Sequence, residues 1–324
     1  MNFFKKKKKF KKKEYKVLIF GSNGRIGSSF LKYYDNCVKL SSNSTLLEVF
    51  SGYKFLEEKD SKVILIFSIP FGAMSKRIEE LENIKPQLKL SKLVVLDCSG
   101  YVKNNLPHFH HLGEETIESY FDNHTRINEK IVYVGNAGCI SSSVIEGMRK
   151  SNVFIYYLFI FYLFFFFIYL ILFIYFIIYT FLFEIDVDKN FPISVSAFGG
   201  KSYVSKGDGT MRTARKWIEH AHVKEIETCL KIKVDSFVPI ICYHLPHGLF
   251  VVINGKTKRN IENIEGNIDT EMDVSSVLET HFINFRFQLS PPNNFSLAVS
   301  IDNIQHVAYL AFKTVLQIQK FLHK

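Results

Sequence analysis

The chain has 324 residues, enough for about two domains, and its 47% hydrophobic content is sufficient for buried cores. The net charge of +10 resembles that of a nucleic-acid-binding protein, but the lysines of 5–9 and 11–13 supply eight of those charges and leave about +2 for the rest. Because no stacking platform or helix-turn-helix pattern accompanies this tail, residues 1–14, we expect a solvated arm and no nucleic-acid binding.

The first predicted strand, residues 15–20, runs directly into a glycine-rich turn. Gly21, Gly24 and Gly27 are spaced G-x-x-G-x-x-G and precede an amphipathic helix pattern. Between a strand and a helix, such glycines allow a tight turn and a close approach of the backbone to a pyrophosphate, which helix N–H groups bind. The pattern predicts a dinucleotide site, with an ordinary glycine-rich loop as the alternative.

The next predicted strand ends in Ser41, Ser42 and Asn43. A protein selective for NAD usually has Asp or Glu near this position, which binds the ribose 2′-hydroxyl. None of the three residues would repel a 2′-phosphate, so the loop favours NADP as the cofactor.

Two further apolar runs, residues 62–67 and 93–96, read as buried strands that alternate with helical stretches. The alternation predicts an α/β fold with a doubly wound parallel sheet. Ligands of such sheets bind at the carboxyl ends of the strands, so we expect Ser68, Pro70 and Asp97 beside a nicotinamide nucleotide. For each of them, ordinary loop structure is the alternative.

Two sequence features bear on metals and disulfides. The three histidines His108, His110 and His111 have no matching carboxylate or cysteine spacing, so we interpret them as a polar loop and predict no metal site. The five cysteines are widely spaced and form no CxxC pair, which favours a reducing compartment, the cytoplasm or the mitochondrial matrix.

The stretch VGNAGCISSS, residues 134–143, places Cys139 after a flexible turn and at the start of a helix pattern. A helix N-terminus favours the thiolate, which can attack an acyl group, and the N–H groups of Gly138 and Cys139 could stabilise the oxyanion. The alternative is a small buried hydrophobe, which is our interpretation of the other four cysteines. They are Cys37, Cys98, Cys229 and Cys242.

Residues 153–183 consist almost wholly of Phe, Ile, Tyr and Leu and are long enough for a transmembrane helix. A single span would place the two halves of the chain on opposite sides of a membrane, although the motifs require both halves in one site. Codons for these residues can be built from A and T alone. We therefore interpret 151–184 as a translated non-coding insert and any predicted span as spurious; a membrane or interface anchor and a soluble insertion are the alternatives.

A pair of histidines follows in EHAHVKEIE, where His220 and His222 are two residues apart. In a helix they project in different directions, so only one is expected to face the Cys139 sulfur. A base is needed there to take the thiol proton. The alternative is a solvated pair on a helix surface.

Taken in order, these motifs resemble those of the N-acetyl-gamma-glutamyl-phosphate reductases, within the semialdehyde dehydrogenase superfamily. The stretches that carry the resemblance are the glycine turn, SIPFGAMS at 68–75, VVLDCSGYVK at 94–103, GNAGC at 135–139, SAFGGKS at 196–202, HAHVKEIE at 220–227, FVPIICYHLPHGLFVVI at 237–253 and IDNIQHVAYLAF at 301–312. Departures from the family pattern include Ala137 before Gly138, Ile140 after Cys139, Ala221 between the histidines, and Lys224.

The resemblance implies NADPH-dependent reduction of N-acetyl-γ-glutamyl phosphate to the semialdehyde plus phosphate, through a cysteine thioester, in arginine biosynthesis. It implies Cys139 as nucleophile and His222 as base. The implied substrate-binding or supporting residues are His220, Gly199, Gly200, Asn136 and Gly138. The implied cofactor-binding residues are Gly21, Ser22, Gly24, Arg25, Ile26, Gly27, Ser41, Pro70 and Asn303.

The resemblance also implies a domain order and an assembly. We expect an NADP-binding domain at 15–150, an α+β catalytic and dimerisation domain at 185–300, and a C-terminal helix at 301–324 that returns to the first domain. A homodimer or homotetramer is implied. The alternatives are a semialdehyde dehydrogenase of the aspartate or aminoadipate type, or a degenerate, non-catalytic nucleotide-binding dimer.

Overall fold

The computed structural model describes the ranges 15–53, 61–106, 109–110, 130–149, 187–200, 211–213, 221–242, 248–258, 283–290 and 293–323. The basic tail 1–14, His108, His111, the segment 151–184 and His220 lie outside these ranges, so what we expect of them stays a prediction. Within the described ranges, no helix has the length and apolarity that a membrane crossing requires.

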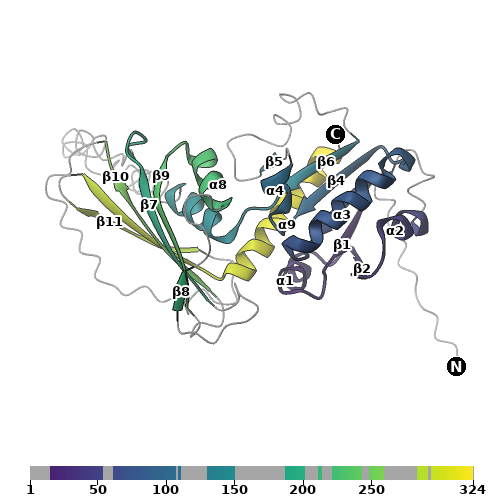
Figure 1. Ribbon diagram of the computed structural model, residues 1–324, viewed down its shortest axis with the longest axis horizontal. Helices are drawn as coiled ribbons and strands as arrows, with labels where there is room; N and C mark the ends of the chain where they lie inside the picture. Colours follow the sequence, from purple (N-terminus) through teal and green to yellow (C-terminus); the bar gives the residue numbers. More distant parts are fainter. Residues whose placement is uncertain are drawn as a thin grey trace, which may run out of the picture. The chain divides into compact units, whose positions relative to one another are not determined.

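The first sheet is parallel throughout, with the strand order β2-β1-β3-β4-β6-β5 (Figure 1). Its strands are β1 (Tyr15–Phe20), β2 (Val38–Leu40), β3 (Lys62–Phe67), β4 (Lys92–Asp97), β5 (Phe109–His110) and β6 (Ile131–Gly135). Strands β1, β3 and β4 are almost wholly buried, as their continuous apolar sequences predict. The predicted α/β class with a parallel sheet is confirmed.

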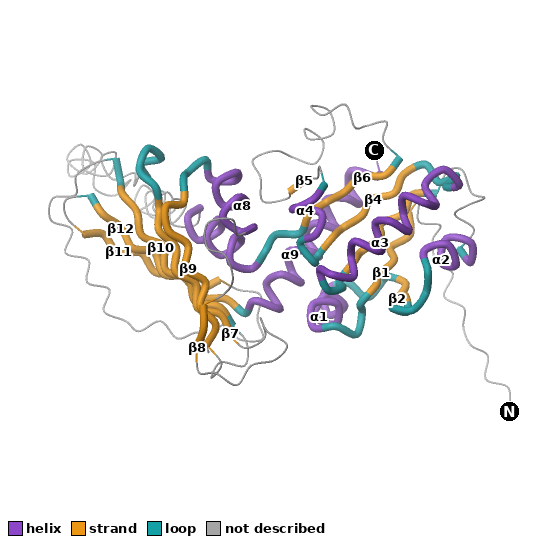
Figure 2. The backbone as a smooth tube through the Cα atoms, in the orientation of Figure 1, coloured by secondary structure: helices purple, strands orange, loops and turns teal. Residues whose placement is uncertain are grey.

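Helices cover both faces of this sheet (Figure 2). The helices are α1 (Arg25–Tyr33), α2 (Leu46–Gly52), α3 (Phe71–Ile84), α4 (Tyr101–Asn105) and α9 (Asn303–His323), with a short 3₁₀ turn at Lys85–Gln87. Successive strand residues point to opposite faces, so Ile19 packs with α1 and α9 while Phe20 packs with α2 and α3.

The strand order reverses at β1, because β2 lies on one side of it and β3 on the other. The connection from β1 to β2 therefore runs in one direction across the sheet, and the connection from β2 to β3 runs in the other. In open α/β sheets, ligands bind outside the carboxyl ends of the strands at such a switch point. Phe20 and Phe67, the last residues of β1 and β3, mark this edge, and the predicted glycine turn follows Phe20 directly.

The second sheet is mixed, with the order β11-β12-β10-β7-β9-β8. Its strands are β7 (Ile193–Gly200), β8 (Met211–Thr213), β9 (Val234–Cys242), β10 (Leu249–Lys256), β11 (Ile283–Ser290) and β12 (Asn294–Ile301). Strands β7 and β9 pair parallel and the other pairs are antiparallel. Buried residues alternate with partly exposed ones along β7, β10 and β12, which indicates that one face packs on a core.

Two helices accompany the second sheet: residues 139–149, which begin at Cys139, and α8 (Ala221–Leu230). The first of them packs closely on β12. A Cβ atom on Gly147 would lie 2.6 Å from Cγ2 of Val299, so the helix reaches this distance only because residue 147 lacks a side chain.

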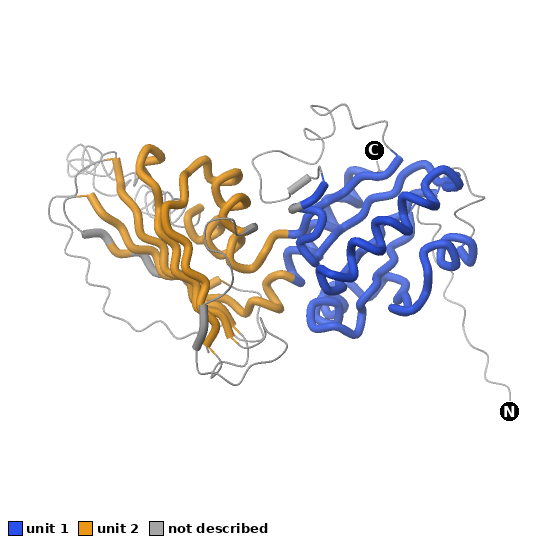
Figure 3. The backbone as a smooth tube through the Cα atoms, in the orientation of Figure 1, with its two compact units in different colours: residues 1–111, 115–136, 308–324 blue, residues 112–114, 137–307 orange. Residues whose placement is uncertain are grey.

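The chain divides into two compact units (Figure 3). Unit 1 comprises 1–111, 115–136 and 308–324, and unit 2 comprises 112–114 and 137–307. We expected the first domain to continue to residue 150, but the chain passes into unit 2 after Asn136, because the helix 139–149 packs on the second sheet. Helix α9 begins in unit 2 and ends in unit 1, where Ala308, Ala311 and Val315 belong to the core.

Candidate active site

In unit 1, the turn after β1 begins at Gly21, in a conformation that requires glycine at this position. Gly21 has φ +78°, and a Cβ atom there would lie 2.0 Å from the backbone oxygen of Ser68 in the loop after β3. Any side chain would therefore collide with backbone at the switch point. The turn is closed by a hydrogen bond of 3.0 Å from Gly24 N to Gly21 O.

Gly27 brings helix α1 against this turn, because a Cβ atom on it would lie 2.1 Å from Gly21 O. Helix α1 has no side-chain hydrogen bond at its N-cap, Gly24, and no acidic residue in its first turn. An anion approaching this helix terminus would meet N–H groups and no competing carboxylate. The geometry suits a pyrophosphate.

The other predicted cofactor contacts of unit 1 differ in exposure. Arg25, Ser41 and Pro70 are exposed, Pro70 being the N-cap of α3. Ser22 is buried, and Ile26 packs partly against the core, so we assign these two residues to the support of the turn.

Asp97, at the end of β4, has a structural role in the first unit. Its Oδ1 accepts a hydrogen bond of 2.7 Å from Ser99 N, and its Oδ2 accepts one of 2.8 Å from Val102 N. The carboxylate is fully buried and fixes the start of α4. Its backbone oxygen accepts from Asn136 N at 2.9 Å, which ties β4 to the end of β6.

In unit 2, Cys139 is the first residue of the helix 139–149 and is partly buried. The three serines after it explain how the helix begins. Ser142 N donates to Gly138 O at 2.8 Å, and the hydroxyls of Ser142 and Ser143 both donate to Cys139 O, at 3.0 and 2.7 Å. The backbone of Cys139 is thereby held at the helix N-terminus, the position predicted from the sequence.

Glu225, on α8, is bonded to residues on both sides of Cys139. Its Oε1 accepts from Gly138 N at 3.2 Å, and its Oε2 accepts from the Ser141 hydroxyl at 2.5 Å. We expected the Gly138 N–H to stabilise an oxyanion, but in the structure this N–H donates to the carboxylate. Glu225 therefore joins α8 to the first turn of the helix that carries Cys139.

His222 belongs to the same network. Its Nδ1 lies 3.3 Å from Ser141 Oγ and 3.5 Å from Glu225 Oε2, with the histidine and glutamate three residues apart on α8. The Ser141 hydroxyl has one proton and two acceptors for it, Glu225 Oε2 at 2.5 Å and Gly138 O at 3.1 Å, so Ser141 Oγ can accept from Nδ1–H. Ser141 Oγ and Glu225 Oε2, the two acceptors beside Nδ1, favour the tautomer with its proton on Nδ1, which has a lone pair on Nε2, the form that a base requires.

The remaining predicted site residues lie elsewhere in unit 2 or outside the described ranges. Gly199 and Gly200 end β7, and Gly200 N donates to Gly248 O at 2.9 Å. Asn303, expected at the cofactor, begins α9 and its Oδ1 accepts from Gly248 N at 2.9 Å. Among the described residues, no group of three or more His, Cys, Asp or Glu side chains could hold a metal ion.

Sequence reasoning did not identify Ser141 and Glu225 as site residues. The only available signal was spacing, because Glu225 is three residues after His222 and therefore shares its helix face. In comparisons with known proteins, no family profile matches the chain and no curated protein is significantly similar to it.

Proposed function

We propose that the protein is an NADPH-dependent reductase of an acyl phosphate that works through a cysteine thioester. The observation that carries the proposal is the network of Ser141, His222 and Glu225 around the helix start at Cys139. Covalent catalysis by cysteine needs a nucleophile at a helix N-terminus and an oriented histidine near it, and Ser141, two residues after Cys139, bonds to such a histidine. The glycine turn of unit 1 supports the dinucleotide part of the proposal.

In the proposed reaction, His222 Nε2 takes the proton of the Cys139 thiol, and the sulfur attacks the acyl carbon. The carbon–sulfur bond forms, the bond to phosphate breaks, and inorganic phosphate leaves with the electron pair. Bound NADPH supplies the hydride that reduces the thioester. The resulting alkoxide re-forms a carbonyl group and expels the sulfur as thiolate, which regains its proton from His222.

Glu225 and Ser141 act through His222. Glu225 accepts the Ser141 proton, Ser141 accepts the proton on Nδ1, and the negative charge stabilises the imidazolium that forms when Nε2 is protonated. The favoured substrate, N-acetyl-γ-glutamyl phosphate, rests on the resemblance of the motifs. Assembly as a homodimer or homotetramer is part of the same proposal.

The test is NADP- and phosphate-dependent oxidation of N-acetylglutamate semialdehyde by the full chain, with the aspartate and aminoadipate semialdehydes as competing substrates. We expect N-acetylglutamate semialdehyde to be preferred and the Cys139→Ser variant to be inactive. Cys37→Ser is the matched control, because Cys37 lies in unit 1 beside Tyr34. Wild-type turnover by Cys139→Ser would refute the thioester mechanism.

One observation favours a second candidate, a non-catalytic nucleotide-binding protein. The Gly138 N–H, a donor that an oxyanion would use, is bonded to Glu225. NADP binding without any thiol-dependent turnover of the three semialdehydes would establish this candidate.

A further inference from the structure

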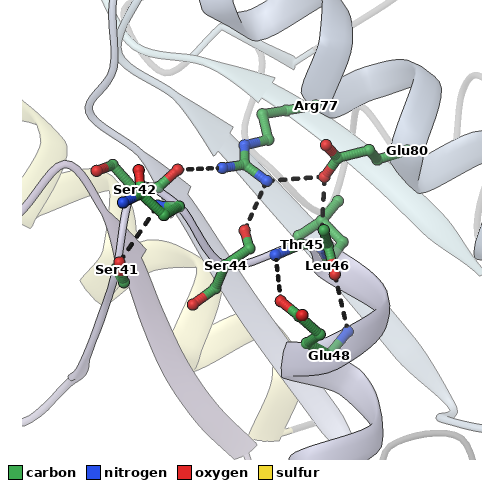
Figure 4. Close-up of polar contacts among 9 residues, drawn as sticks. Ser41, Ser42, Ser44, Thr45, Leu46, Glu48, Arg77 and Glu80 are labelled. Carbon is green, nitrogen blue, oxygen red and sulfur yellow. Dashed lines mark hydrogen bonds and ion pairs between the residues drawn. The ribbon is translucent and has the colours of Figure 1, made fainter.

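Arg77, on α3, reaches across to the loop that follows β2 (Figure 4). Its Nη1 donates to Ser44 O at 2.8 Å, and its Nη2 donates to Ser42 O at 2.6 Å. Nη1 also bonds to Glu80 Oε2 at 2.7 Å. One guanidinium group thus binds two backbone oxygens of the same four-residue loop.

The guanidinium is held in place from the core side as well. Its central carbon lies 4.6 Å from the centroid of the Phe20 ring, and the Phe20 ring stacks on Phe67 at 5.4 Å. Both rings are fully buried at the ends of β1 and β3. The Arg77 side chain is only 12% exposed. Its guanidinium is therefore fixed at the carboxyl edge of the sheet, against Phe20, which is the residue before Gly21.

The loop also has two hydrogen bonds of its own. Ser44 N donates to Ser41 O at 3.2 Å, and Asn43 N donates to Ser41 Oγ at 3.2 Å. Beyond it, Thr45 and Glu48 form a reciprocal capping box at the start of α2. Since Glu48 already occupies that helix terminus, an anion at this loop would depend on residues 41–43, which are exposed.

This arrangement offsets the partial negative charge that the loop's own carbonyl oxygens would present to a phosphate. Backbone carbonyl oxygens carry partial negative charge, and Arg77 engages those of Ser42 and Ser44. The exposed hydroxyl and amide groups of residues 41–43 carry no charge, and the end of β2 is where a dinucleotide places its ribose 2′-substituent. Because Glu80 pairs with Arg77, the arginine favours a 2′-phosphate over a 2′-hydroxyl through the loop conformation that it holds.

We propose that Arg77 is the positioning residue that sets a preference for NADP over NAD, by holding the 41–44 loop in a phosphate-accepting conformation. The inference rests on the proposed dinucleotide site at the glycine turn and concerns only the choice of cofactor. It makes no use of Cys139.

The test is calorimetric titration of the full chain with adenosine 2′,5′-bisphosphate and with 5′-AMP, which differ in the 2′-phosphate alone. We expect wild-type protein to bind the bisphosphate about tenfold more tightly. Arg77→Met should reduce this ratio to about one, while the Kd for 5′-AMP changes less than about twofold. Arg77→Lys keeps the charge but lacks the planar fork that spans two carbonyls, so it should lose most of the preference. This variant replaces Arg77→Met in the test if Arg77→Met does not fold.

Lys76→Met is the matched control, because Lys76 is the exposed neighbour of Arg77 on α3 and the same charge is removed. It should keep the wild-type ratio. An unchanged ratio in Arg77→Met, or an equal loss of affinity for both ligands, would overturn the proposal. If the wild-type protein binds both ligands equally, the role of Arg77 is overturned but the dinucleotide site is not. If the wild-type protein binds neither ligand, the dinucleotide site and the role of Arg77 are both overturned.

Discussion

The Glu225→Gln variant is the most informative change in unit 2, because it preserves shape and reverses one hydrogen bond. The carboxylate accepts from Gly138 N and from the Ser141 hydroxyl. A glutamine has one accepting and one donating end. If its oxygen faces Gly138 N, its NH₂ group faces Ser141 Oγ, and the Ser141 proton then goes either to His222 Nδ1 or to Gly138 O, 3.1 Å away.

The expected consequence is a weaker base at His222. If Nδ1 accepts from Ser141, the neutral imidazole carries its proton on Nε2 and cannot take the thiol proton. If Ser141 donates to Gly138 O instead, the imidazolium has still lost the negative charge of Glu225 that stabilised it. We therefore expect kcat to fall by about 10²–10⁴, the usual contribution of a general base. The alternative rotamer places two donors, the amide and Gly138 N–H, against each other in a buried position. Either way, the variant should lose about 1–3 kcal/mol of unfolding free energy.

The assay is steady-state reduction of NADP with N-acetylglutamate semialdehyde, together with urea unfolding. Glu227→Gln is the control on the same helix, because Glu227 Oε1 accepts a backbone hydrogen bond of 3.0 Å from Val234 N, which a glutamine oxygen can also accept. The control should keep wild-type kcat within about twofold. A Glu225→Gln variant with wild-type kcat would refute the role given to the Ser141–His222 hydrogen bond.

Three further predictions concern the thiols, the glycine turn and the apolar segment. Iodoacetamide at pH 7.5 should modify Cys139 before the three thiols whose pKa is raised by burial, because a raised pKa leaves less reactive thiolate. Peptide mass mapping would show the order of modification, and earlier labelling of any of the three would contradict the prediction. Those three are Cys37, Cys98 and Cys242. Gly21→Ala should lose about 3 kcal/mol of unfolding free energy, measured with urea, and should abolish nucleotide binding. The control is Gly52→Ala, whose Cβ would meet nothing within 4 Å and which should be neutral or slightly stabilising. Equal stability of the two variants would be inconsistent with the close contact between residue 21 and Ser68. Sequencing of the mature transcript should show that codons 151–184 are absent, and an mRNA that retains them would reject the intron interpretation.

The sequence predicted most of the first sheet, for a physical reason. The strands at 15–20 and 62–67 are apolar runs that end in turns. A parallel strand that is buried on both faces needs such a nearly continuous apolar sequence. The need for glycine at position 21 was also readable, because φ > 0 and close backbone contact both require it.

The polar network of unit 2 could not be read in the same way. Glu225 is 84 positions from Ser141, and nothing in either segment specifies that their side chains meet. Asp97 likewise has a structural role that the sequence did not predict, because both of its carboxylate oxygens bond to the start of the next helix. The unit boundary after Asn136 was missed because it depends on which sheet the helix 139–149 packs against.

The contact between Gly147 and Val299 has a consequence for how this protein tolerates mutation. The distance between the Cys139 helix and β12 is set by two apolar positions, neither of which takes part in the proposed chemistry. Adding a single methyl group at residue 147 would push the helix away from the sheet and shift its first turn, together with the hydrogen bonds that Gly138 and Ser141 make to Glu225. A substitution with no polar or reactive atom would then abolish turnover as completely as the loss of the thiol.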